Sequence, residues 1–297
     1  MIEVKNLTKS FDGFKALDKL TMTVPSGAIY GLVGPNGAGK STIIRHITGI
    51  MRQDSGEVMV EGESIFENTA KKNEIAYISD DVFYFQQATI ADMMKFYRGI
   101  YPNFSSARYE KLLTAFELNG KTRMRSLSKG MQKQAAFILG ASLCPKLIVM
   151  DEPVDGLDPV MRRQVWGIVM SDVAESGTTV LVSSHNLREL EDVCDHVGIM
   201  NKGKMLLERS LSELQENIVK VQLALPDGIS IPEGLDVLHH TGTGRLQTYI
   251  IRGISETVAD TLSSCSPIFM DLLPLSLEEI FIYELGGENY EVKDILL

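Results

Sequence analysis

The chain has 297 residues, with 29 Lys and Arg against 39 Asp and Glu, so its formal net charge is −10. A mean hydropathy of +0.02 and 44% hydrophobic residues are typical of a soluble globular protein. The strongest apolar stretch, residues 135–144, is about half as long as a membrane-spanning helix must be. We expect no export signal at the N-terminus, and three cysteines far apart in the sequence suit a reducing cytosol. Secreted and membrane-spanning proteins are therefore excluded, and the acidic charge argues against extensive nucleic-acid binding.

Acidic side chains are concentrated toward the C-terminus. After Glu216 the chain has 4 basic and 12 acidic residues, so the last 81 residues carry −8 and the first 216 carry the remaining −2. This shift predicts a boundary near Asn217, with one domain at 1–216 and a small acidic domain at 217–297. Variation of surface charge within one domain is the alternative explanation.

The N-terminal part predicts short strands followed by a helix. Strand-like runs at 2–7 and 20–24 are separated by turn residues. The continuous apolar run at 28–33 is typical of a buried parallel strand, and a glycine-rich turn follows it. Four isoleucines at helical spacing within 43–50 then predict a helix, so the order is strand, glycine turn, helix.

Further along, a parallel sheet interrupted by a helical block is the economical interpretation. Short apolar runs at 75–78, 147–150 and 179–182 predict buried strands, and about 82–145 reads mainly as helix. The tail predicts a small α+β unit. Its expected strands are 219–225, 236–239, 245–251 and 268–272, and its expected helices are 255–262 and 276–283.

The glycine-rich turn fits the phosphate-binding pattern of Gly, four residues, then Gly-Lys-Ser/Thr. Its residues are Gly34, Pro35, Asn36, Gly37, Ala38, Gly39, Lys40, Ser41 and Thr42. Glycines let backbone N–H groups turn inward around an anion, and the start of the helix adds positive potential. We expect Lys40 to contact the β- and γ-phosphates of a nucleoside triphosphate and the Ser41 hydroxyl to bind Mg²⁺. A chance glycine-rich turn is the alternative.

Two polar groups follow predicted strands. Asp151 and Glu152 end the run at 147–150, where the carboxyl edge of a parallel sheet places ligands. We expect Asp151 to hold Mg²⁺ and Glu152 to orient or deprotonate the attacking water. An acidic helix start would explain the same residues structurally. His185 follows the strand at 179–182, which we expect beside the strand that carries Asp151. It could therefore reach a γ-phosphate, or act only as a structural hydrogen-bonding residue.

A second anion site is predicted where a helix begins after Ser128. Ser128 and Gly130 offer a hydroxyl and a bare backbone at the positive end of that helix. An ordinary N-cap is the more frequent use of such a serine.

Taken together and in this order, these motifs resemble those of the ATP-binding cassette (ABC) ATPases, the nucleotide-binding subunits of ABC transporters. The resemblance covers roughly residues 1–214, and the whole pattern is most similar to exporter-type bacterial systems. Residues 34–42 match Walker A and 147–152 match Walker B with its catalytic glutamate. Leu127–Met131 resembles the signature motif, Gly156–Asp158 the D-loop and His185 the switch histidine. Phe11, 23 residues before Gly34, stands where the family places an adenine-stacking aromatic.

The chain departs from the family pattern at three places. Lys129 and Met131 replace two signature residues, and Phe11 replaces the commoner tyrosine. The third departure is Asp80, 40 residues after Lys40, which stands at the position of the Q-loop glutamine that touches Mg²⁺ or water. Gln86 and Gln87 are nearby substitutes with poorer spacing.

The resemblance implies a P-loop NTPase of the α/β class. Its expected architecture is a RecA-like parallel sheet with an N-terminal antiparallel β-subdomain, an inserted helical subdomain at about 82–145 and a small C-terminal α+β domain. It also implies a head-to-tail dimer, with an identical or a different cassette. Each Mg-ATP would meet Lys40, Asp151, Glu152 and His185 of one copy and Ser128 and Gly130 of the other. Asp158, in the D-loop match, is also expected to contribute to nucleotide binding.

Closing and opening of this dimer would drive a separate membrane permease from the inner face of the cell membrane. The aromatic run Phe83-Tyr84-Phe85 beside Asp80 is a possible docking surface, or simply part of the core. A soluble cassette protein acting on a cytosolic assembly is the alternative function. A small-molecule kinase and a catalytically inactive cassette fit less well.

Overall fold

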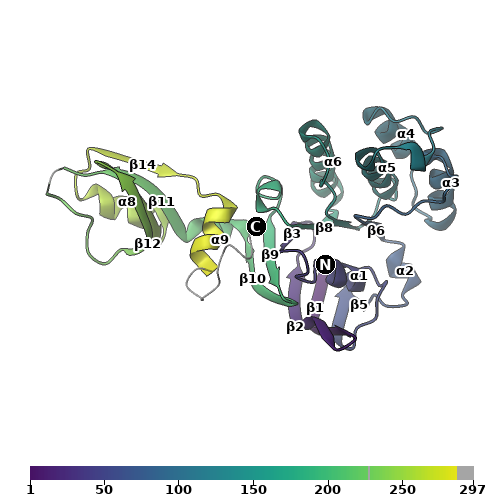
Figure 1. Cartoon of the computed structure of the whole chain (residues 1–297), viewed down its shortest axis with the longest axis horizontal. Coiled ribbons are helices and arrows are strands. Elements are labelled where there is room, and N and C mark those ends of the chain that lie inside the picture. The colour runs from purple at the N-terminus through teal and green to yellow at the C-terminus, as the bar shows by residue number, and fades with distance from the viewer. Residues whose placement is uncertain (227, 286–297) are drawn as a thin grey trace. The chain divides into compact units, whose positions relative to one another are not determined.

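The computed structural model of this chain describes residues 1–226 and 228–285 (Figure 1). They form two compact units, one of residues 1–185 with 196–208, the other of residues 186–195 with the chain from Arg209 onward. The second unit begins before the predicted boundary at Asn217, because Ser210 caps helix α7 and the Leu211 N–H donates to the Asp195 carbonyl, 2.9 Å away. Residues 286–297 of the predicted C-terminal domain lie outside the described residues.

A six-stranded sheet forms the centre of the first unit, in the order β10-β9-β3-β8-β7-β6. Its strands are β3 (Ile29–Val33), β6 (Ile75–Ile78), β7 (Leu147–Asp151), β8 (Thr179–Ser184), β9 (His196–Asn201) and β10 (Lys204–Ser210). Pairing is parallel from β9 through β3, β8 and β7 to β6. Every residue of β3, β7 and β8 is buried, which explains their unbroken apolar runs.

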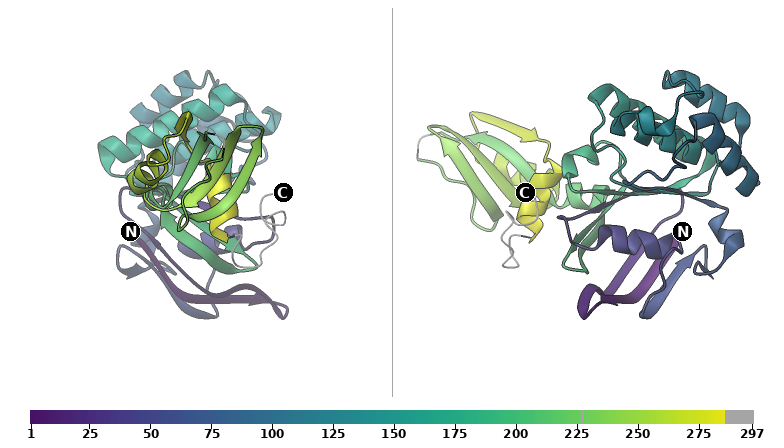
Figure 2. Two further views of the ribbon diagram at one scale, coloured as in Figure 1. Left: turned by 90° about the vertical axis from the view of Figure 1, so that its left-hand side faces the viewer. Right: turned by 45° about the vertical axis from the view of Figure 1, so that its right-hand side comes forward.

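A second, antiparallel sheet packs beside it in the order β2-β1-β4-β5. Its strands are β1 (Ile2–Phe11), β2 (Phe14–Val24), β4 (Ser55–Val60) and β5 (Glu63–Ser64). Alternate residues of β1 and β2 enter a core shared with helix α1 (Lys40–Ile47) and with the central sheet. Figure 2 shows this sheet and α1 on one side of the central sheet and the longer helices on the other.

Those longer helices begin at side-chain caps. They are α3 (Ile90–Ile100), α4 (Ser106–Ala115), α5 (Lys129–Ala141) and α6 (Pro159–Ser176), and short helices α2 (Thr69–Lys72) and η1 (Met124–Ser126) also occur. Their N-caps are Thr89, Ser105, Ser128 and Asp158. Helices α3, α4 and α5 lie within the helical block expected at about 82–145.

The second unit contains an antiparallel sheet in the order β12-β13-β11-β14. Its elements are η2 (Leu187–Glu189), α7 (Leu211–Glu216), β11 (Ile218–Ala224), β12 (Asp236–Thr243), β13 (Leu246–Arg252), α8 (Ser255–Ser263), β14 (Phe269–Leu273) and α9 (Leu277–Leu285). Val258 and Leu262 of α8 join Val221 and Ile251 in its core. Among the described residues, no helix combines the length and apolar character needed to cross a bilayer.

Candidate nucleotide site

The glycine-rich turn leads from β3 into α1 in a shape that only glycine permits at two positions. A Cβ on Gly34 would collide with the Met200 carbonyl oxygen. Gly39 has φ of 104°, and a Cβ there would lie 2.8 Å from the Ala16 carbonyl oxygen. The turn is therefore packed tightly against its surroundings, and its backbone is left-handed immediately before α1.

Lys40, the first residue of α1, is held inside this turn. Its side chain is only 7% exposed, and Nζ donates to the Gly34 carbonyl at 2.6 Å. The same Nζ lies 3.4 Å from Oε1 of Glu152. A buried ammonium at the start of a helix adds its charge to the N–H groups there, so this corner of the molecule attracts anions.

Two neighbouring strand ends bring the predicted acidic residues into place. Asp151 at the end of β7 is in register with Ser183 of β8. The Ser183 hydroxyl donates to Asp151 Oδ1 at 2.6 Å and accepts from the Glu152 N–H at 3.1 Å. Ser183 thus orients both residues, a role that sequence reasoning missed because it depends on the register between the two strands.

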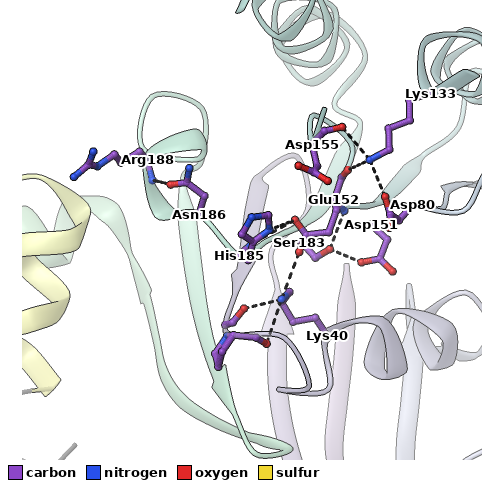
Figure 3. Close-up of polar contacts among 12 residues, drawn as sticks. Lys40, Asp80, Lys133, Asp151, Glu152, Asp155, Ser183, His185, Asn186 and Arg188 are labelled. Atoms are coloured by element: carbon purple, nitrogen blue, oxygen red, sulfur yellow. Dashed lines mark hydrogen bonds and ion pairs between the residues drawn. The ribbon is translucent and has the colours of Figure 1, made fainter. Parts of the chain in front are cut away.

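Glu152 and His185 form a hydrogen-bonded pair at this edge (Figure 3). Nδ1 of His185 lies 2.9 Å from Glu152 Oε2, and the His185 backbone N–H donates to the same oxygen at 3.3 Å. Glu152 has φ of 48°, a left-handed conformation that is uncommon outside glycine and costs about 1–3 kcal/mol. Its carboxylate is thus held between Lys40 and His185, the arrangement of a positioned base and its orienting partner.

Lys133 of α5 is a second residue of this site that the sequence did not indicate. Its Nζ lies 2.7 Å from Asp80 Oδ1 and donates to the carbonyls of Glu152 at 2.9 Å and Asp155 at 3.1 Å (Figure 3). Asp80, two residues after β6, therefore reaches the turn at 152–155 through this lysine.

The remaining predicted residues make their described contacts elsewhere. Ser128 caps α5 by accepting from the Met131 N–H, and Asp158 caps α6 by accepting from the Val160 and Met161 N–H groups. A Cβ on Gly130 would lie 3.4 Å from the carbonyl of Gly156.

Phe11 at the end of β1 is 42% exposed, with Lys9 Nζ 5.6 Å from its ring centre. An exposed ring of this kind can stack on a planar ligand. The cation over it belongs to a side chain that is also paired with Asp54.

Known proteins are similar to this chain in sequence and in fold. A sequence profile described as ABC transporter matches residues 17–155. The ABC transporter ATP-binding protein YtrB of Bacillus subtilis strain 168 is 31% identical over 292 residues, which is 97% of this chain and 99% of YtrB. A solved structure of an ATP-binding subunit of an ABC transporter has a TM-score of 0.67 and 28% identity over 72% of this chain and 92% of its own.

A second solved structure shares the fold at 21% identity. It is the dimeric post-hydrolysis state of the ATP-binding cassette MJ0796 with ADP and Pi, with a TM-score of 0.66 over 71% of this chain and 99% of its own.

Proposed function

The chain belongs to the ABC transporter family as an ATP-binding subunit, and we propose that it hydrolyses Mg-ATP to drive a separate membrane permease. One observation carries the catalytic part of this proposal: the Glu152 carboxylate is held between the Lys40 ammonium and the His185 ring. Similarity to YtrB along nearly the whole chain carries the transport part.

We assign ATP binding to the turn at 34–42. Backbone N–H groups of the turn and of the first residues of α1 would surround the phosphates, and Lys40 would move its ammonium from the Gly34 carbonyl onto the β- and γ-phosphates. The exposed ring of Phe11 would stack on adenine.

In the chemical step, a water oxygen attacks the γ-phosphorus while the bond from that phosphorus to the β–γ bridging oxygen breaks. Glu152 orients this water and accepts its proton, so the products are ADP and inorganic phosphate. His185 holds the Glu152 carboxylate in place, and Lys40 offsets the negative charge of the phosphates. The partly buried site strengthens both interactions relative to water.

The side chains of this site suit an Mg²⁺ ion that binds together with ATP rather than a metal ion held by protein ligands alone. Among the described residues, no group of three or more His, Cys, Asp and Glu side chains could hold a metal ion. Mg²⁺ bound with ATP takes most of its ligands from phosphates and water, so the Ser41 hydroxyl and the Asp151 carboxylate suffice. Asp80 was the third predicted ligand, and its described partner is Lys133. Bound Mg²⁺ would neutralise charge that develops on the phosphates.

We propose that two cassettes, identical or different, close on the ATP. Ser128 is exposed at the start of α5, beside Gly130, and could present its hydroxyl to the γ-phosphate on a facing copy. Asp158, the N-cap of α6, belongs to the same set of motifs. Loss of the γ-phosphate would remove the charge that holds the two faces together.

Substitution of Glu152 by Gln tests the catalytic assignment, because it keeps the shape of the side chain and removes the base. We expect ATP binding and ATP-dependent dimerisation to persist while phosphate release falls by about a hundredfold or more. The matched control Glu110→Gln, on the exposed side of α4, should leave turnover unchanged. Undiminished turnover in Glu152→Gln, or a monomer at saturating Mg-ATP, would contradict the proposal.

We place the permease contact at an aromatic surface made of Phe83, Phe85 and Phe96. Phe83 and Phe85 are 64% and 47% exposed, and edge-to-face contacts join the three rings. They adjoin a pocket of about 380 Å³ that Phe83, Tyr97 and Tyr101 help to line. An exposed aromatic patch beside a pocket suits an apolar helix or loop of a partner on the cytoplasmic side of the membrane.

Loss of this aromatic surface should weaken permease binding without changing ATP hydrolysis. We expect Phe83→Ala with Phe85→Ala to reduce co-purification of a multi-span membrane protein from detergent-solubilised membranes by about tenfold or more. Basal ATP turnover of the purified variant should stay near the wild-type value. Co-purification at the wild-type level would place the contact elsewhere.

A further inference from the structure

Lys133 makes three polar contacts, as many as its ammonium has N–H donors. They reach the Asp80 carboxylate and the carbonyl oxygens of Glu152 and Asp155, and the lysine side chain is only 11% exposed. Each donor therefore has one acceptor, and two of these acceptors are backbone atoms of the turn that carries the proposed catalytic base.

This turn needs support from outside itself. Glu152 has the uncommon left-handed backbone conformation, and the Asp155 N–H closes the turn on the Glu152 carbonyl at a long 3.4 Å. A cation that binds the carbonyls at both ends of residues 152–155 offsets the cost of the strained turn. It also fixes the direction in which the Glu152 side chain leaves the backbone.

Asp80 supplies the anion that keeps Lys133 in this place. The aspartate is 54% exposed, so the pair gains little from burial, but its carboxylate contacts the same ammonium that binds the two carbonyls of the turn (Figure 3). A neutral glutamine at residue 80 could accept a hydrogen bond but could not balance the lysine charge. Residues 80 and 133 thus form a matched pair.

We propose that Lys133 is a positioning residue for hydrolysis, which links Asp80 to the turn at 152–155 and thereby orients the Glu152 carboxylate. The inference rests on the proposed ATPase function and deepens it. In this role Lys133 acts through the turn rather than on ATP or water, and Asp80 acts through Lys133.

The test uses full-length protein with Lys133→Met, which keeps the length of the side chain and removes its charge. The turnover number should fall about tenfold to a hundredfold, because a small misplacement of a base is costly, while KM for ATP changes less than about twofold. Lys111→Met, at an exposed position of α4, is the matched control and should behave like wild type. Wild-type turnover in Lys133→Met, or a change confined to KM, would overturn the proposal.

Asp80→Asn and the double variant Asp80→Asn with Lys133→Met separate the pair from a metal-ligand role. If Asp80 acts through Lys133, the two losses in turnover combine to less than their product, and the Mg²⁺ concentration for half-maximal activity stays unchanged. Losses that multiply fully, with a raised Mg²⁺ requirement in Asp80→Asn, would overturn it.

Hydrogen exchange gives a readout that does not depend on ATP hydrolysis. Amides of residues 152–158 should exchange faster in Lys133→Met than in wild type and Lys111→Met. A chain without ATPase activity would refute the proposed function, whereas unchanged exchange in this segment would refute the role of Lys133.

Discussion

His46 is a buried histidine whose titration bears on the stability of the glycine-rich turn. It lies on α1 with 1% exposure, and Nδ1 is 2.7 Å from the carbonyl of Thr42, one turn earlier in the helix and the last residue of the phosphate-binding motif. The other ring nitrogen is buried, with no hydrogen-bond partner among the described residues. Burial lowers the pKa of His46, and the Thr42 carbonyl opposes that shift only in part.

Acid should therefore destabilise the protein through His46. Between its lowered pKa in the folded chain and about 6.5 in the unfolded chain, the unfolded state binds more protons, so the free energy of unfolding falls as pH falls through this window. His46→Asn keeps a donor near the Nδ1 position and removes the titration. Urea unfolding between about pH 7 and 5 should show a weaker pH dependence for His46→Asn than for wild type. Equal slopes would contradict this assignment.

At this scale the sequence predicted residues whose chemistry is local and missed those whose role depends on neighbours. The shape of one turn or one strand end fixes the spacing of the residues that were found: Gly34, Lys40, Asp151 and Glu152. Lys133 acts across 19 residues of chain on the Glu152 carbonyl. No periodicity encodes such a contact, so it required the structure.

The helix starts show how one side chain can serve both the fold and the site. Ser128 accepts from the Met131 N–H at 3.2 Å and is exposed, so capping and phosphate binding are compatible in it. The sequence alone left these two roles open. The structure establishes the cap, and the phosphate contact stays a prediction.

Ser128→Asp separates the two roles of this serine. Asp caps a helix about as well as Ser, so stability in urea should stay within about 0.5 kcal/mol of wild type, whereas Ser128→Ala should lose about 1 kcal/mol. ATP-dependent dimerisation, measured by light scattering in the Glu152→Gln background, should instead fail in Ser128→Asp because its carboxylate repels the γ-phosphate. A full dimer in Ser128→Asp would rule out the contact between copies.

Most elements were predicted because their patterns are complete within a few residues. The buried runs of β3, β7 and β8 and the amphipathic helices of the middle block were all confirmed. The sequence placed the strand before His185 beside the strand that carries Asp151, and the pairing of β8 with β7 confirms it. The order of the other strands needed the structure, because any buried apolar strand can pair with any other. Strands β4, β5, β9 and β10 and helices α2, α6 and α7 were not predicted, although Val165, Trp166 and Val169 mark a buried face of α6.

For the whole molecule, the discontinuous second unit could not be predicted from charge. Charge was compared along the chain, whereas residues 186–195 join this unit through contacts with a distant helix. Helix η2 lies against α9, and Leu187 and Leu190 are buried. Glu191 Oε1 accepts from the Leu277 N–H at 2.9 Å, and Arg188 pairs with Glu278.

This packing makes the ordered structure of residues 186–195 depend on the second unit. Leu190→Ala removes a side chain with no exposed surface, at a cost of about 2–5 kcal/mol, whereas Arg188→Ala breaks an exposed ion pair worth less than about 1 kcal/mol. In Leu190→Ala we expect faster hydrogen exchange in residues 186–195 and 277–285. The fluorescence of Trp166, the single tryptophan and part of the first unit, should keep its urea midpoint.

ATP turnover should then report whether that opening reaches the site. Asn186 follows His185 directly, so loss of order in 186–195 frees one side of the residue that holds the Glu152 carboxylate. Turnover in Leu190→Ala should fall by several-fold while Arg188→Ala stays close to wild type. If Leu190→Ala exchanges faster yet hydrolyses ATP at the wild-type rate, His185 is held entirely by the first unit, and the second unit contributes nothing to catalysis.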